Sequence, residues 1–187
     1  TYMAVCKDGK MGELQKVSFG TKVAELVGDA DVKAIAIGTK LYDASAMDLV
    51  IEADTQIGNG VITVYSSKCC MIHETEEVLL AERKQSCGKC TFCREGLIQL
   101  HTMVKEITEG QGKKEFTDMM EEIGEAMTFS TPCTMGQTAS DFAMGSLKYF
   151  AGEYEDHIKK KKCANNVCSA FMSIYIDPDL CEGCEEC

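Results

Sequence analysis

Residues Ser86–Gly96 read Ser-Cys-Gly-Lys-Cys-Thr-Phe-Cys-Arg-Glu-Gly, with two residues between each pair of cysteines at Cys87, Cys90 and Cys93. A tight turn can point all three sulfurs toward one common ligand position. Thiolates repel one another, so three held this close need a cation or a metal cluster between them. A [4Fe–4S] cluster takes four thiolates. The stretch therefore predicts such a cluster, with its fourth ligand elsewhere in the chain.

Cys133 is the best candidate for the fourth ligand. It follows Cys93 by forty positions (133 − 93), past two predicted helices. Out-and-back helices return the chain to the same end of a bundle, so Cys133 can reach the site. A helix beginning just after the three cysteines would offer free backbone N–H groups and a partial positive charge to an anionic cluster. The alternative is zinc on the same four cysteines, although zinc more often takes two well-separated pairs.

Composition narrows the class of protein. The chain has 187 residues, 45% of them hydrophobic, with a net charge of −11, which suits one or two globular domains and argues against a nucleic-acid partner. It has no apolar run of the roughly 20 residues that a membrane span needs, and no signal peptide is recognisable. Twelve cysteines, with the repeated two-residue spacing, favour metal ligation in the reducing cytoplasm over disulfides.

Residues 1–73 have the pattern of a small α/β unit. Alternating apolar residues and turn formers predict a short helix around Val23–Val27, followed near Gly38–Asp43 by a turn. The strands are expected at Tyr2–Cys6, Leu14–Phe19, Lys33–Ile37 and Val61–Tyr65. This order is typical of a β-grasp, or ubiquitin-like, unit. None of its residues carries obvious chemistry, so its expected role is docking.

Residues 74–158 change to helical periodicity. Four helices are expected, at Glu74–Lys84, Arg94–Thr108, Lys114–Met127 and Gln137–His157. Short connections between them predict a four-helix bundle that carries the cluster. Residues 159–187 form a cysteine-rich tail with a strand-like stretch at Phe171–Ile176. The predicted fold class is therefore α+β.

A second group of ligands is His157, Cys163 and Cys168, together with either Cys69 or Cys70. Three cysteines and one histidine are a common set for structural zinc. The neighbouring lysines 159–162 would offset thiolate charge. The alternative is a set of unligated thiols and a surface histidine.

The third group is Cys181, Cys184 and Cys187, spaced like the opening of a bacterial ferredoxin motif. The x3-Cys-Pro that continues such a motif is missing, so a complete cluster on these three residues alone is not expected. The favoured interpretation is the start of a truncated ferredoxin-like domain. The alternative is a disordered tail.

The motif in Glu82–Gly96, together with Cys133-Thr-Met-Gly136, resembles the NADH-binding flavoprotein subunit of respiratory complex I and the β subunits of NAD-linked and electron-bifurcating hydrogenases. The resemblance implies a flavin domain, then a ubiquitin-like unit, then a bundle with one [4Fe–4S] cluster. It assigns the cluster to Cys87, Cys90, Cys93 and Cys133. It also favours Cys70 over Cys69 as the partner of His157, in a zinc site that pins the tail to the bundle.

One departure from that family affects the predicted function. The glycine-rich segment through which the family binds FMN and NADH is missing, so this chain alone is not expected to bind either, and a complete NADH-oxidising enzyme is disfavoured. The sequence predicts an electron-transfer module that relays electrons between a flavin on another domain or chain and other iron–sulfur centres. Its expected partners are flavin-bearing and iron–sulfur redox subunits in a hetero-oligomer. The alternative is a zinc-containing docking scaffold without a working cluster.

Overall fold

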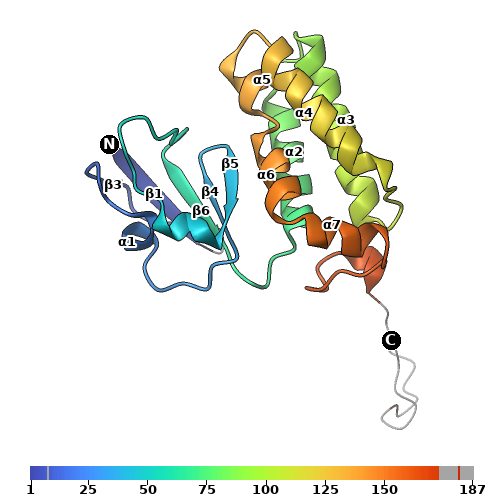
Figure 1. Cartoon of the computed structure of the whole chain (residues 1–187), viewed down its shortest axis with the longest axis horizontal. Coiled ribbons are helices and arrows are strands. Elements are labelled where there is room, and N and C mark those ends of the chain that lie inside the picture. Colours follow the sequence, from blue (N-terminus) through green and yellow to red (C-terminus); the bar gives the residue numbers. More distant parts are fainter. Residues whose placement is uncertain (8, 173–180, 182–187) are drawn as a thin grey trace.

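The computed structural model describes residues 1–7, 9–172 and 181. A small mixed sheet lies beside a bundle of helices, and the chain passes once from the first to the second (Figure 1). This arrangement confirms the predicted α+β class. Residues 173–176 of the strand-like stretch 171–176, and Cys184 and Cys187 of the third cysteine group, lie outside the described residues.

The sheet has the β-grasp topology. Its central strands, β1 (Tyr2–Lys7) and β6 (Val61–Tyr65), are parallel, and β4 (Ala34–Ile37) runs antiparallel to β6. The order is β2-β1-β6-β4-β5, with β3 also paired to β1. The remaining elements of this unit are β2 (Lys10–Met11), β3 (Gln15–Lys16), α1 (Val23–Val27), β5 (Lys40–Asp43) and the 3-10 helix η1 (Ala44–Asp48).

Two strand predictions need correction. The strand predicted at Leu14–Phe19 is reduced to the two residues of β3. The segment predicted as a turn, Gly38–Asp43, contains the edge strand β5. The reversal takes only Gly38 and Thr39, because Gly38 adopts a φ of +60° that L-residues rarely take. A shorter turn leaves four residues free to pair with β4.

Strand β4 is buried on both faces. Ile35 and Ile37 pack with α1 in the core of the β-grasp unit. Ala34 and Ala36 belong instead to a second apolar cluster that contains Phe142 of the bundle. Because alanine side chains are short, the helices can approach this face of the sheet closely. The alternation of isoleucine and alanine thus gives one strand two different neighbours.

The bundle contains three long helices close to their predicted positions: α2 (Met71–Gln85), α3 (Thr91–Thr108) and α4 (Glu115–Ser130). Their apolar faces form one core, and the predicted stripe Leu97, Leu100, Val104 and Ile107 of α3 is buried. None of the helices in the described ranges combines the length and apolar character that crossing a bilayer would require.

The fourth predicted helix, Gln137–His157, is wrong as a single element. The chain forms α5 (Thr134–Thr138), α6 (Asp141–Tyr149) and α7 (Ala151–Ile158) instead. Ser140 lies at the first break, where its hydroxyl donates a hydrogen bond to the Gly124 carbonyl of α4 and so ties the break to that helix. Phe150 lies at the second break, with φ −121° and ψ 28°. These breaks redirect α7 toward the beginning of α2.

Helix α6 packs directly on the edge strand β5. A Cβ added at Gly145 would lie 2.5 Å from the carbonyl oxygen of Leu41. The Thr39 hydroxyl donates a 3.0 Å hydrogen bond to Asp141 at the beginning of α6, and the Tyr65 and Phe142 rings meet edge to face. The β-grasp unit is therefore held to the bundle by close backbone packing at Gly145.

We predict that Gly145→Ala destabilises the protein by about 1–3 kcal/mol, because an added methyl group in a packed contact forces the backbone apart. The matched control is Gly152→Ala in α7, where an added Cβ meets no atom within 4 Å. Alanine there favours the helix by roughly 0.5–1 kcal/mol. Urea unfolding of both variants measures the difference. Equal stabilities would contradict the proposed close contact.

Candidate metal centres

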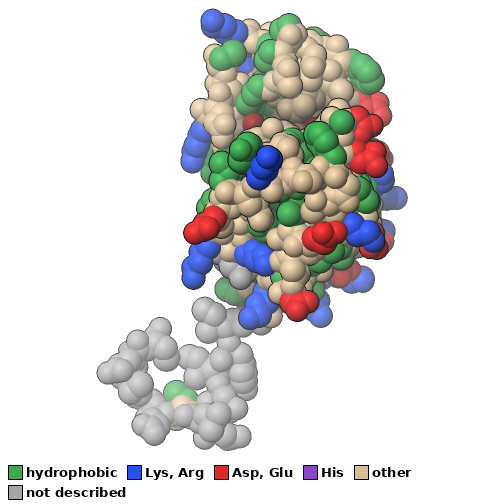
Figure 2. All heavy atoms as spheres, turned by 90° about the vertical axis from the view of Figure 1, so that its left-hand side faces the viewer, with side chains coloured by type: hydrophobic (Ala, Val, Ile, Leu, Met, Phe, Trp, Pro, Cys, Tyr) green, Lys and Arg blue, Asp and Glu red, His purple; other side chains and the backbone are tan. Residues whose placement is uncertain are grey.

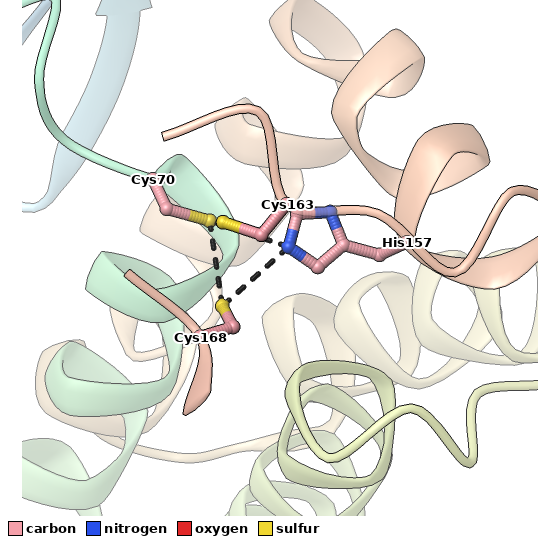
Figure 3. A group of neighbouring side chains, drawn as sticks. All are labelled: Cys70, His157, Cys163 and Cys168. Carbon is pink, nitrogen blue, oxygen red and sulfur yellow. Dashed lines mark hydrogen bonds between the residues drawn. The ribbon is translucent and has the colours of Figure 1, made fainter. Parts of the chain in front are cut away.

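Four buried side chains from separate segments converge at the lower end of the bundle (Figure 3). Cys70 caps the beginning of α2, and His157 lies in the last turn of α7. Cys163 and Cys168 follow on the loop after α7. All four residues are at most 4% exposed. The alternative of a surface histidine is therefore wrong for His157.

The spacing of these atoms is that of ligands around one ion. The Cys70 and Cys168 sulfurs are 3.7 Å apart, and each lies 3.5 Å from Nε2 of His157. A tetrahedral ion bound at about 2.3 Å to sulfur and about 2.0–2.1 Å to nitrogen would put two sulfurs about 3.8 Å apart and sulfur and nitrogen about 3.5–3.6 Å apart. A disulfide would need about 2.05 Å. The four ligand atoms all lie within 4.8 Å of one another, with Cys163 included.

The imidazole of His157 is oriented for ligation. Its Nδ1 lies 2.8 Å from the Glu153 carbonyl oxygen, which can only accept a hydrogen bond. The proton therefore belongs on Nδ1, and Nε2 faces the thiols. This arrangement, with the distal nitrogen anchored on a carbonyl, is the usual support of a metal-binding histidine. The Phe171 ring meets the imidazole edge to face at 5.1 Å between centroids.

The charges of the site also suit a cation. The hydrogen bond from the Cys168 thiol is the largest effect on Cys70 and, with His157, lowers the pKa of Cys70 to about 3 despite burial. Burial alone would lower the pKa of His157, but its bonds to Cys70 and Glu153 raise it to about 9. Both shifts arise because the thiols and the imidazole lie within hydrogen-bond distance of one another. A bound divalent cation would replace these protons, because thiols and imidazole bind metals in their deprotonated forms.

The loop that carries Cys163 and Cys168 is bent to reach the site. Lys161 and Asn166 both have a φ of 51°, a left-handed conformation that is uncommon for residues other than glycine. Lys161 is held there by a 2.7 Å hydrogen bond from Nζ to the Gly110 carbonyl. Strain of this kind persists only where surrounding contacts impose it.

A half-buried cation next to the site, Lys33, ties the β-grasp unit to the bundle, and sequence reasoning missed it. Lys33, just before β4, makes a 2.7 Å ion pair with Glu153 and donates a 2.6 Å hydrogen bond to the Cys69 carbonyl. It also reaches Asn165 on the ligand loop at 3.3 Å. The other carboxylate oxygen of Glu153 accepts the Met71 N–H at 3.0 Å. Four segments around the site therefore share one charge network.

The structure places Cys70, and not Cys69, in the four-ligand group. The side chain of Cys69 is half-buried, and its sulfur lies 3.9 Å from the Ser66 hydroxyl instead of in the four-ligand group. The member of the four-residue group is thus Cys70, the residue that the resemblance favoured. Of the third cysteine group, only Cys181 is described, and it is exposed.

The other predicted site lies at the opposite end of α2, whose fifteen residues span about 22 Å. Cys87 is exposed, Cys90 caps the beginning of α3, and Cys93 is buried in its first turn. Gly88 has a φ of +70°, and its carbonyl accepts a 3.0 Å hydrogen bond from Arg94. The connection between α2 and α3 is thus fixed as a tight turn around the cysteines.

Helix α5 lies at the same end of the bundle as the connection between α2 and α3 (Figure 1). Cys133 is the N-cap of α5 and is exposed. Its loop is anchored on both sides: Thr131 donates to the Met127 carbonyl at 2.8 Å, and the Gln137 amide donates to the Thr131 carbonyl at 3.1 Å. Helix α5 contacts both α3 and α4. The out-and-back path of α3 and α4 thus brings Cys133 to the end where Cys87, Cys90 and Cys93 lie.

These four cysteines do not have the spacing of a single-ion site. Within the described residues, the only group with three or more ligand atoms inside 4.8 Å is the one around Cys70. A cubane places irons and sulfides between its thiolates, so its ligands stand farther apart than ligands of one ion.

In this chain a β-grasp unit precedes a helical bundle that carries one group of cysteines at each end. Residues 74–157 match the model of the NADH-ubiquinone oxidoreductase-F iron–sulfur binding region. This part of the chain belongs to that family, which confirms the resemblance found in the cysteine motif.

Two curated relatives support this placement. The NADP-reducing hydrogenase subunit HndC of Solidesulfovibrio fructosivorans is 34% identical over 131 residues, which cover 70% of this chain and 27% of the relative. The mitochondrial 51 kDa subunit of the NADH-ubiquinone oxidoreductase of Neurospora crassa is 28% identical over 122 residues, covering 64% of this chain and 25% of the relative. The chain thus spans about a quarter of the length of these relatives.

The fold also matches solved structures. An NAD+-reducing [NiFe]-hydrogenase in the H2-reduced state superposes with a TM-score of 0.77 over 84% of this chain and 29% of that chain. The sequences are 18% identical, so this likeness shows the fold alone.

We predict that Cys163→Ser removes one equivalent of zinc from the purified protein, because a closed four-ligand site loses much of its affinity with one thiolate. Cys69→Ser is the matched control, since Cys69 is the cysteine next to the site that does not face it. Metal analysis after gel filtration measures both. Unchanged zinc in Cys163→Ser, or equal loss in the two variants, would contradict the assignment.

Proposed function

We propose that this chain is an electron-relay module of an NADH-dehydrogenase-like or hydrogenase-like complex. It holds a [4Fe–4S] cluster on Cys87, Cys90, Cys93 and Cys133. The observation that carries the proposal is the match of residues 74–157 to an iron–sulfur binding region, combined with the arrival of all four cysteines at one end of the bundle. When bound, such a cluster accepts and releases single electrons.

The surroundings of the four cysteines support this role. The Ser86 hydroxyl lies 3.5 Å from the Cys93 sulfur and can donate a hydrogen bond to it as a thiolate. Such bonds, with burial and nearby charge, adjust the potential of iron–sulfur centres. Cys93 is buried, whereas Cys87 and Cys133 are exposed. The protein therefore encloses one side of the site and leaves the other side open to a partner.

The electron donor and acceptor lie outside this chain in the proposal. A flavin on another domain or chain delivers or receives electrons on one side, and further iron–sulfur centres do so on the other. Both curated relatives are named as subunits of larger enzymes, which supports a hetero-oligomer with flavin-bearing and iron–sulfur partners. The acidic composition and the thiol-rich sites favour a cytoplasmic location.

The second site is proposed to hold structural zinc on Cys70, His157, Cys163 and Cys168. Zinc is redox-inert, and a site with four protein ligands keeps no open position for chemistry. Its role is mechanical: it joins the beginning of α2, the end of α7 and the loop at residues 159–168. The proposed organisation is a β-grasp unit at 1–73, a cluster-binding bundle at 74–158 and a tail at 159–187 that begins a ferredoxin-like domain.

The second candidate function is a docking scaffold that contains zinc but no working cluster. The geometry of the Cys70 site favours it, since this group has single-ion spacing. Elemental composition separates the two candidates.

Anaerobic iron, sulfide and zinc analysis is expected to give about four irons, four sulfides and one zinc per chain. About eight irons would show that the terminal cysteines also build a cluster. Zinc without iron, after anaerobic expression with ample iron, would contradict the electron-relay function and support the docking scaffold.

Cys90→Ser is expected to abolish or shift the paramagnetic signal of the reduced cluster, because it replaces one thiolate ligand. Cys6→Ser is the control, since Cys6 lies on β1, far from the ligand turn in the sequence. Electron paramagnetic resonance of dithionite-reduced samples measures both. A Cys90→Ser signal identical to that of the unaltered chain would reject this ligand.

A further inference from the structure

The surface around Cys87 and Cys133 differs in charge from the rest of the chain. The whole sequence contains 30 acidic and 19 basic residues. The two segments that form this end, residues 83–94 and 126–140, contain no acidic residue at all. The first contributes four cations, Arg83, Lys84, Lys89 and Arg94, and the second is uncharged throughout.

Four acidic residues border the two segments, Glu82, Glu95, Glu125 and Asp141, and of these only Glu125 is exposed. Glu82 is half-buried, and burial raises the pKa of its carboxyl group. Glu95 pairs with Arg94 at 2.8 Å. Lys84 and Lys89 are exposed and make no ion pair within the described residues. Both can therefore meet charges from outside.

Two exposed aromatic residues flank the same cysteines. Phe92, between Cys90 and Cys93, is 51% exposed, and Phe129, four residues before Cys133, is 87% exposed. Phe129 is the most exposed large hydrophobic residue in the described part of the chain. In Figure 2 the upper tip shows basic and hydrophobic side chains, and acidic side chains appear lower down.

Compensation of the cluster charge explains the cations but not the phenylalanines. An uncharged aromatic ring does not neutralise a thiolate, and its exposure to water is unfavourable. Aromatic residues are, however, enriched at the centres of protein interfaces, and a charged rim speeds association with a partner of opposite sign. The combination thus describes a contact surface.

We propose that the end of the bundle around Phe92, Phe129, Lys84 and Lys89 is the docking face for a redox protein or domain whose contact surface is acidic around an apolar centre. The proposal rests on the proposed function, because it places that partner against the exposed side of the cluster. Electrons then cross where Cys87 and Cys133 reach the surface.

The test measures electron transfer by stopped flow between the cluster-loaded chain and two probes of opposite charge. The acidic probe is a reduced plant-type ferredoxin, which donates to the oxidised chain. The basic probe is oxidised cytochrome c, which accepts from the reduced chain. Each is measured at 50 mM and 500 mM NaCl, because salt screens attraction between exposed charges.

The charge variant is Lys84→Glu combined with Lys89→Glu. Its matched control is Lys113→Glu combined with Lys114→Glu, which changes net charge equally at the connection between α3 and α4, the opposite end of the bundle. Lys113 and Lys114 are exposed. Phe129→Ser is the uncharged variant. It separates docking from any effect of altered charge on the cluster potential.

With ferredoxin at 50 mM NaCl, the charge variant is expected to slow electron transfer at least tenfold, within the range of electrostatic steering. The control pair should remain within about threefold of the unaltered chain, and the difference should shrink at 500 mM NaCl. The charge variant should accelerate transfer to cytochrome c. Phe129→Ser should slow transfer from ferredoxin several-fold at both salt concentrations.

Equal slowing by the two charge pairs would overturn the proposal, because net charge alone would then explain the rates. Rates unaffected by Phe129→Ser would also overturn it. A dimer that Phe129→Ser converts to monomer in sedimentation would assign this face to a second copy instead. All variants must retain the reduced-cluster signal. Its absence from the unaltered chain would instead contradict the proposed function.

Discussion

Burial of thiolates is the constraint on which the lower end of the molecule depends. A buried charged group is costly unless another charge and hydrogen bonds compensate it. Cys70, His157, Cys163 and Cys168 come from three segments that would otherwise have no reason to meet. The breaks at Ser140 and Phe150, the bent ligand loop and the Lys33–Glu153 ion pair all bring charge or ligands to this point. The proposed zinc ion would compensate the thiolates and hold the three segments together.

Helix α2 separates the two proposed centres. It begins at the four-ligand site and ends at the cysteine turn, about 22 Å away. The two sites therefore have independent surroundings: one is enclosed by Phe171 and the ligand loop, and the other is open on the side of Cys87 and Cys133. One helix, α2, therefore sets the distance between the proposed zinc site and the proposed cluster.

Much of this arrangement could be predicted from local patterns. The cysteine spacing, the stripe on α3 and the alternation in β4 are visible in the sequence, because each depends on residues close together in the chain. The choice of Cys70 also agreed with the structure, although it came from the resemblance and not from the residues alone. The single fourth helix failed because Ser140 and Phe150 are not strong helix breakers, and only tertiary contacts interrupt the chain there.

The missed features all depend on long-range contacts. Lys33 looked like an ordinary residue at the beginning of a strand, and nothing near it in the sequence indicates Glu153, 120 positions later (153 − 33). His101 is buried, and its Nδ1 lies 2.7 Å from Nη1 of Arg83 on α2, a contact that no local pattern indicates. Both contacts depend on how elements that are far apart in the sequence pack against one another.

The exposure of the two ligand sets agrees with the different work proposed for them. A structural ion gains from exclusion of water and competing ligands, and its four ligands are at most 4% exposed. A redox centre that exchanges electrons with another protein must instead lie near the surface, and two of its four cysteines do. Surface exposure also allows the surface charge to discriminate between redox partners, because a partner must approach that face closely. The lack of acidic residues in segments 83–94 and 126–140, within a chain of net charge −11, is consistent with an accessible cluster that a partner of acidic surface approaches.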